Sequence, residues 1–216
     1  TGTTPRRTAA RARRRPRAEW EVRILASAVE TFAREGFGVP MQRLVEDSGA
    51  PVGTFYRLFP DKDLLFARVM ADLHPGYLER VAEVVGDESD PVEWLRSTVE
   101  ALIIVGVREF GPVARLYFTD VRGRGPAGTV ARRVERGELE LLLGPLRDGL
   151  DVGAFECADA GLAALGVLGL TRKTVEAYVL GRTRPRLETV AAQAGTIVVE
   201  GLRARPAATA RRGGRQ

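Results

Sequence analysis

The chain has 216 residues, 44% of them hydrophobic, and a net charge of +5 at pH 7. This length suits one medium domain or two small ones with a buried core, and the composition is that of a globular chain. His74 and Cys157 are the single histidine and the single cysteine, which leaves little material for catalytic triads, metal sites or disulfides. No run approaches the roughly 20 apolar residues of a membrane span, and no apolar signal core follows the N-terminus. We therefore expect a cytoplasmic binding protein with no cofactor, no metal and no enzymatic activity.

Positive charge is concentrated at the two ends of the chain. Residues 1–18 contain seven arginines and residues 203–216 contain five, with no acidic residue in either segment, so the part between them is acidic. Arginine mixed with small residues and proline cannot bury a core, so we expect a disordered basic arm over 1–18 and a basic tail over 205–216. Such segments bind polyanions, most often nucleic acid. For the tail, a solvated segment without a partner is an equal alternative.

Four helices are predicted in the N-terminal third. Residues 19–35 carry apolar side chains three and four positions apart, and Gly36 ends that helix. Proline at the first helical position and glycine at the end then predict two short helices and a longer one, over 40–48, 51–59 and 61–74. We expect the sequence His74-Pro75-Gly76 to break or bend the last of these, which sets a domain boundary between residues 74 and 75.

The rest of the chain also has helical periodicity. Apolar stripes separated by glycine and proline predict further helices over 91–110, 112–121, 129–150, 158–180 and 185–204, with a loop over 123–128. No run of alternating β-branched residues is long enough for a sheet. The fold class is therefore all-α, with about nine helices. A three-helix N-terminal domain over 19–74 precedes a larger helical domain over 75–204.

Two short helices joined by Gly49-Ala50-Pro51 have the spacing of a helix-turn-helix, in which the first helix braces the second against the major groove. The runs RILASAVETFAREGF and MQRLVEDSGAPVGTFYRLFPDKDLL resemble the DNA-binding domain of the tetracycline repressor (TetR/AcrR) family. The resemblance covers residues 19–72 closely. Two departures are Gly38-Val39-Pro40, where the family usually has a capping Thr or Ser, and Pro51, where it often has Ser.

The resemblance implies a set of DNA contacts. Thr54 and Tyr56 would touch phosphates or bases, Lys62 would hold a phosphate, and the recognition surface would include Val52, Gly53 and Arg57, with Gln42 and Arg43 on the preceding helix. Arginine can bond guanine O6 and N7 together, so Arg57 is the candidate for base reading. A core role for Tyr56, and a phosphate contact without sequence information for Arg57, remain open. Because acids outnumber bases over 19–74, we expect the N-terminal arm to supply additional phosphate contacts.

The second half is expected to bind a ligand and to dimerise. Small residues along the last two predicted helices permit close helix packing, which suits a dimer interface built on Leu162, Leu165, Val190, Ala194, Ile197 and Val198. Ordinary packing within one chain is the alternative. The aromatic side chains are candidates for a largely apolar ligand pocket, formed by Trp94, Phe110, Tyr117, Phe118 and Tyr178.

These features predict a ligand-responsive transcriptional regulator that acts as a repressor. The expected protein is a homodimer that binds a palindromic double-stranded DNA operator and is released by a small apolar or amphipathic effector. One alternative is a sequence-nonspecific DNA-binding protein that acts through its arginine-rich arms. Another is a helical enzyme, which would have to work without histidine and cysteine chemistry.

Overall fold

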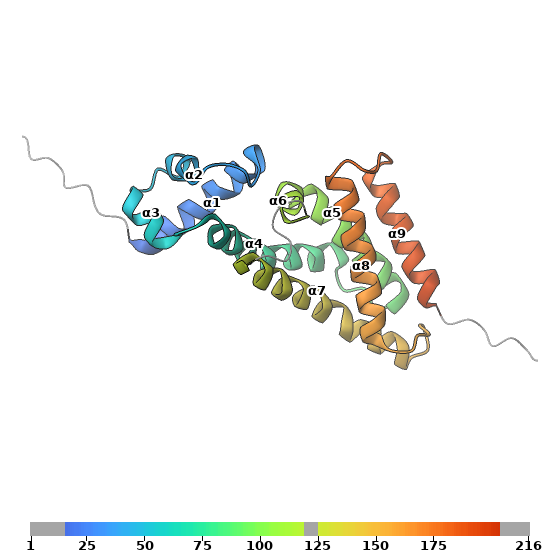
Figure 1. Cartoon of the computed structure of the whole chain (residues 1–216). Helices are drawn as coiled ribbons and strands as arrows, with labels where there is room; N and C mark the ends of the chain where they lie inside the picture. Colours follow the sequence, from blue (N-terminus) through green and yellow to red (C-terminus); the bar gives the residue numbers. More distant parts are fainter. Residues whose placement is uncertain (1–15, 119–124, 204–216) are drawn as a thin grey trace, which may run out of the picture.

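The computed structural model describes residues 16–118 and 125–203, and over these residues it contains nine α-helices and a single isolated β-bridge, between Phe155 and Arg203 (Figure 1). The all-α prediction is confirmed. Within the described part, no helix is long and apolar enough to cross a bilayer. The predicted arm and tail lie outside the described residues, except for residues 16–18.

The N-terminal domain packs three helices and the first half of a fourth around aromatic side chains. These helices are α1 (Arg17–Glu35), α2 (Met41–Ser48), α3 (Val52–Leu58) and α4 (Lys62–Val85). Phe32, Phe55 and Phe66 are buried completely or nearly so, and Phe32 meets Phe66 edge to face at 5.6 Å between ring centroids. Asp61 caps α4, since its carboxylate accepts a hydrogen bond from Leu64 N at 2.7 Å.

The larger domain is built around α5 (Figure 1). The helices of this domain are α5 (Pro91–Arg108), α6 (Gly111–Leu116), α7 (Gly125–Asp151), α8 (Ala160–Val179) and α9 (Leu187–Leu202). Helix α5 packs against α4, α7, α8 and, most extensively, α9. Close approach of α9 needs Gly195, since a Cβ there would lie 3.3 Å from Arg96 O. Helices α8 and α9 lie side by side at the end of the molecule away from α2 and α3.

Helix α4 does not end where the sequence predicted. It continues through Pro75 to Val85, so the expected boundary between residues 74 and 75 lies inside a helix. Proline removes one backbone hydrogen bond, but buried Val69 before it and Val81 after it anchor the helix on both sides. The loop predicted over 123–128 is also wrong from Gly125 onward, because α7 begins there; residues 119–124 lie outside the described part.

The turn between α2 and α3 depends on Gly49, which has a φ of 61°. This left-handed conformation is strained for a residue with a Cβ, and a Cβ here would also approach Arg23 Nη2 to 3.1 Å. We predict that Gly49→Ala lowers the free energy of unfolding by about 1 kcal/mol. Gly53→Ala is the matched control, because Gly53 is helical and nothing lies within 4 Å of an added Cβ; it should not destabilise. Urea unfolding of both variants is the measurement, and equal effects would contradict the role of the turn.

Candidate DNA-binding surface and ligand cavity

Two polar clusters hold the helix-turn-helix rigid. At the turn, Arg23 Nε donates to Ser48 O at 2.8 Å, and the buried Ser48 hydroxyl accepts from Ala50 N at 3.2 Å while donating to Val45 O. These bonds satisfy backbone groups where α2 ends. The angle between α2 and α3 is therefore fixed by α1, through Arg23.

The second cluster is centred on Asp47 of α2. Its carboxylate accepts from Thr31 Oγ1 at 2.8 Å and from Arg34 Nη2 at 2.7 Å, both on α1, and Arg43 Nε lies 3.3 Å away. The hydrogen bond from Thr31, followed by those cations, lowers the pKa of Asp47. The stability from this contact is thus present above the ordinary pKa of an aspartate and is lost as the pH falls through the lowered value.

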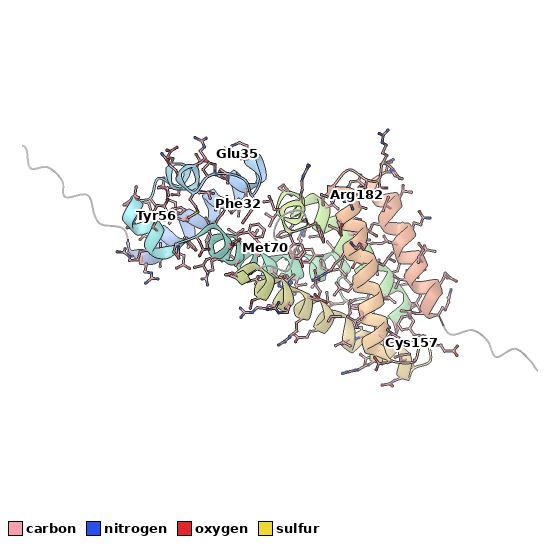
Figure 2. All side chains as sticks on the ribbon, in the orientation of Figure 1. Phe32, Glu35, Tyr56, Met70, Cys157 and Arg182 are labelled. Atoms are coloured by element: carbon pink, nitrogen blue, oxygen red, sulfur yellow. The ribbon has the colours of Figure 1, made fainter. Side chains whose placement is uncertain are left out.

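Helix α3 presents polar and small groups to solvent and a phenylalanine to the core. Val52 is 62% exposed and Tyr56 is 41% exposed, whereas Phe55 is fully buried. Figure 2 shows Tyr56 on α3, at the end of the molecule away from α8 and α9. Gly53 and Arg57 are also exposed, and Thr54 is half-buried. The alternative that Tyr56 is a core residue is therefore not supported.

Arg57 differs from the other arginines of this domain. Among the described residues 19–74, it is the one arginine for which no ion pair or hydrogen bond is found: Arg34, Arg43 and Arg68 pair with acids, and Arg23 bonds Ser48 O. An exposed guanidinium on α3 without an internal partner has all its donors available for a ligand. Its place at the exposed face of the second helix is where a helix-turn-helix reads DNA.

The remaining predicted DNA contacts are engaged within the chain. Gln42 Nε2 donates to Glu46 Oε1 at 3.1 Å, and Arg43 faces Glu35 and Asp47. Lys62 Nζ donates to Phe37 O at 2.7 Å and lies 5.0 Å from the centre of the Phe37 ring. The lysine thereby joins the start of α4 to the turn after α1, which the sequence did not indicate. An ammonium keeps two further N–H donors.

A cavity of about 100 Å³ lies where the two domains meet, lined by side chains of α4, α5, α6, α7 and α8 and by the short segment after α6. Figure 2 shows Met70, one of its lining residues, on the part of α4 between the two domains. Of the predicted pocket residues, Phe110, Tyr117 and Phe118 line it. Trp94 and Tyr178 do not; they pack instead against the apolar cluster between α5, α8 and α9. Aromatic type alone could not separate pocket from core.

Five polar residues of the cavity wall were not predicted: His74, Tyr77, Glu138, Thr171 and Arg172. Arg172 Nε and Nη2 both donate to Glu138 Oε2, at 2.8 and 2.6 Å. Tyr77 Oη donates to Leu102 O at 3.0 Å, and burial raises the pKa of this tyrosine. His74 Nε2 is buried with no hydrogen-bond partner among the described residues. Burial, aided by the charge of Arg172, lowers the pKa of His74, so its imidazole is neutral at pH 7.

The pair between Arg172 and Glu138 is buried, with side-chain exposures of 16% and 9%. Burial raises the pKa of Glu138 above its ordinary value, although the charge and hydrogen bonds of Arg172 oppose the rise. The short, doubly hydrogen-bonded geometry keeps the carboxylate ionised beside a guanidinium that does not deprotonate. Such a pair satisfies two charges that would otherwise be unpaired in an apolar wall.

The predicted dimer residues divide into two groups. Leu162, Leu165 and Ile197 are 63%, 52% and 56% exposed on α8 and α9, and Val190 is half-buried. Ala194 and Val198 are 4% and 8% exposed because they face the cluster against α5. Ala194 and Val198 therefore pack within the chain, on a different stripe of α9 from the one that faces outward.

Comparison with known proteins identifies the class. Residues 24–69 match the family described as bacterial regulatory proteins, tetR family. No curated protein matches the sequence. The match identifies residues 24–69 as a tetR-family DNA-binding domain, and the fold of the described chain is the one found in solved structures of that family.

Solved structures share the fold over most of the chain. A putative transcriptional regulator from Saccharomonospora viridis in complex with choline has a TM-score of 0.74 at 17% identity, covering 87% of this chain and 100% of its own. The regulator FadR from Bacillus subtilis in complex with stearoyl-CoA has a TM-score of 0.71 at 19% identity, covering 83% and 98%. AibR in complex with isovaleryl coenzyme A and operator DNA has a TM-score of 0.65 at 17% identity, covering 82% and 97%.

The buried pair gives a stability prediction. Glu138→Gln leaves the Arg172 guanidinium buried without its main counter-charge, so we expect the free energy of unfolding to fall by about 3 kcal/mol. Glu135→Gln is the matched control: Glu135 Oε2 is 3.4 Å from Arg172 Nη1, but the side chain is 45% exposed, so about 0.5 kcal/mol or less is expected. Chemical unfolding measures both, and equal losses would mean that the pair is not effectively buried.

Proposed function

We propose that this protein is a ligand-responsive repressor that binds a palindromic operator as a homodimer through α3. The observation that carries the proposal is the exposed α3, braced by Arg23 and Asp47 and presenting the unpaired guanidinium of Arg57. A dimer would place two such helices in successive major grooves, about 34–36 Å apart. The family match over residues 24–69 supports this use of the surface.

The cavity is the proposed effector site, because two of its walls are also parts of the DNA-binding unit. Helix α4 contributes Met70 and His74 to the cavity and begins four residues after α3 ends. Helix α6 contributes Val113, which is also buried in the N-terminal core cluster. A ligand that binds one arrangement of α4 and α6 better than another would shift the two DNA-reading heads and weaken operator binding. The complexes of similar regulators with choline and acyl-CoA esters support a small-molecule effector.

The proposed dimer face comprises the exposed apolar side chains Leu162 and Leu165 of α8 and Ile197 of α9. Three large apolar side chains on two adjacent helices form a surface whose burial would be favourable. Helices α8 and α9 contact each other, so two copies would form a four-helix interface by a twofold rotation.

Operator recognition can be tested with Arg57→Ala. Selection of duplexes from a random pool should first yield one palindromic site for the wild type. If Arg57 reads a guanine, the variant should lose about tenfold or more in affinity for that site and relax the preference at one position of each half-site. Arg80→Ala is the matched control, since Arg80 is exposed but pairs with Glu83 and Glu109 outside the DNA-binding domain. Uniform enrichment of all duplexes would contradict the proposal and favour a nonspecific DNA-binding protein.

The dimer face is tested by introducing charge. Leu165→Glu should shift the protein from dimer to monomer in analytical ultracentrifugation, because a buried carboxylate without a partner opposes association. Val84→Glu is the control: Val84 is 53% exposed but lies on α4, away from the proposed face. A wild type that is monomeric, or a dimer that Leu165→Glu leaves intact, would contradict this interface.

A further inference from the structure

The wall of the cavity contains two formal charges, Glu138 and Arg172, and they are committed to each other. The two guanidinium nitrogens Nε and Nη2 both reach Glu138 Oε2. Among the described residues that line the cavity, no other carries a charge at neutral pH; residues 119–124, which follow Phe118 in the chain, lie outside the described part. The described lining is therefore neutral, although an ion pair is part of it.

This pairing disfavours ligands of either charge. An anion that paired with Arg172 would leave Glu138 buried without its counter-charge. A cation would have to lose its hydration shell in order to contact a carboxylate that is already hydrogen-bonded to Arg172. Removing one partner from a buried pair is strongly unfavourable, and an isolated charge in an apolar site more so. Glu135, the second acid near Arg172, is outside the lining and 45% exposed, where solvent screens it.

Two polar side-chain groups of the described lining have no hydrogen-bond partner among the described residues, the Tyr117 hydroxyl and His74 Nε2, and of these two His74 Nε2 is the fully buried one. The Tyr77 hydroxyl donates its proton to Leu102 O, and the Thr171 hydroxyl donates to Leu168 O. His74 Nε2 is buried and no described residue offers it a hydrogen bond. Helix α7 packs against the Cε1–Nε2 edge of the ring, where a Cβ on Gly137 would approach His74 Cε1 to 2.8 Å and Nε2 to 3.7 Å. A buried polar atom is costly unless it is paired, so a ligand that pairs with it gains affinity.

From this geometry we infer that the effector is an uncharged, predominantly apolar molecule with one hydroxyl or carbonyl group, which forms a hydrogen bond with His74 Nε2. The inference rests on the cavity being the effector site. A volume of about 100 Å³ is on the scale of apolar cavities that hold a single ring, such as those of about 150 Å³ that bind benzene or xenon. The ligand class differs from choline, a cation, and from acyl-CoA esters, which are anions.

Four ring compounds of matched size test the charge requirement in the wild-type protein. Toluene, benzyl alcohol, benzoate and benzylammonium are titrated while the Cε1–H resonance of His74 is followed by NMR; the chain has one histidine, so the signal is unambiguous. Benzyl alcohol should bind and move this resonance. Benzoate and benzylammonium should bind at least about tenfold more weakly, because each would bring an unpaired charge into the site.

The variant His74→Leu tests the hydrogen bond. Benzyl alcohol should bind it about tenfold more weakly than the wild type, because its hydroxyl would be buried without a partner, whereas toluene should not lose affinity. Tyr178→Phe, which removes a hydroxyl from an aromatic residue outside the cavity lining, is the control and should change neither affinity. The wild-type NMR titration stands by itself if His74→Leu does not fold.

The outcomes separate the two claims. If benzoate or benzylammonium binds as tightly as benzyl alcohol, or if benzyl alcohol binds without moving the His74 signal, the ligand class is wrong and the effector site stands. If none of the four compounds binds, the cavity is not a ligand site, and the proposed effector response fails with it. Equal weakening of toluene and benzyl alcohol in His74→Leu would likewise overturn the hydrogen bond.

Discussion

The continuity of α4 is the constraint on which the rest of the structure depends. This helix of 24 residues contributes Leu65 and Phe66 to the core of the DNA-binding domain, then His74 and Tyr77 to the cavity, and finally Val81 to the packing against α5. An α-helix is stiff along its axis, so a displacement at the cavity is carried to the residues that support α3. Together with α6, whose Val113 is buried in the N-terminal core cluster, this shared helix joins the two halves.

The junction between the two domains is packed in a way that lowers the stability of the protein, and its location between the DNA-binding surface and the larger domain gives a reason for this. A well-packed junction would have no cavity and no unpaired histidine nitrogen, and the Arg172–Glu138 pair would be replaceable by apolar side chains at little or no loss. The junction instead keeps an opening of about 100 Å³ with polar groups in its wall. Imperfect packing at this junction is what the proposed effector site would require, because such a site changes state on binding.

The sequence was sufficient for the helices and the helix-turn-helix, because glycine, proline and apolar spacing are local signals. It could not reveal that α4 continues past Pro75, since the residues that bury Val69 and Val81 and so hold the helix in place come from distant segments. Nor could it separate Ala194, which faces α5, from Ile197, which faces solvent, on the same helix. The cavity wall was missed for the same reason: Glu138 and Arg172 lie 34 positions apart, and only folding brings them together beside His74.

The coupling between cavity and DNA can be measured most directly by filling the cavity without a ligand. Ala114 on α6 lines it, and Ala114→Phe would occupy the space permanently. The account predicts that this variant, once shown by urea unfolding to be folded, binds the selected operator at least about tenfold more weakly than the wild type in fluorescence anisotropy, a typical coupling strength between two sites. An unchanged operator affinity in a folded variant with a filled cavity would contradict it.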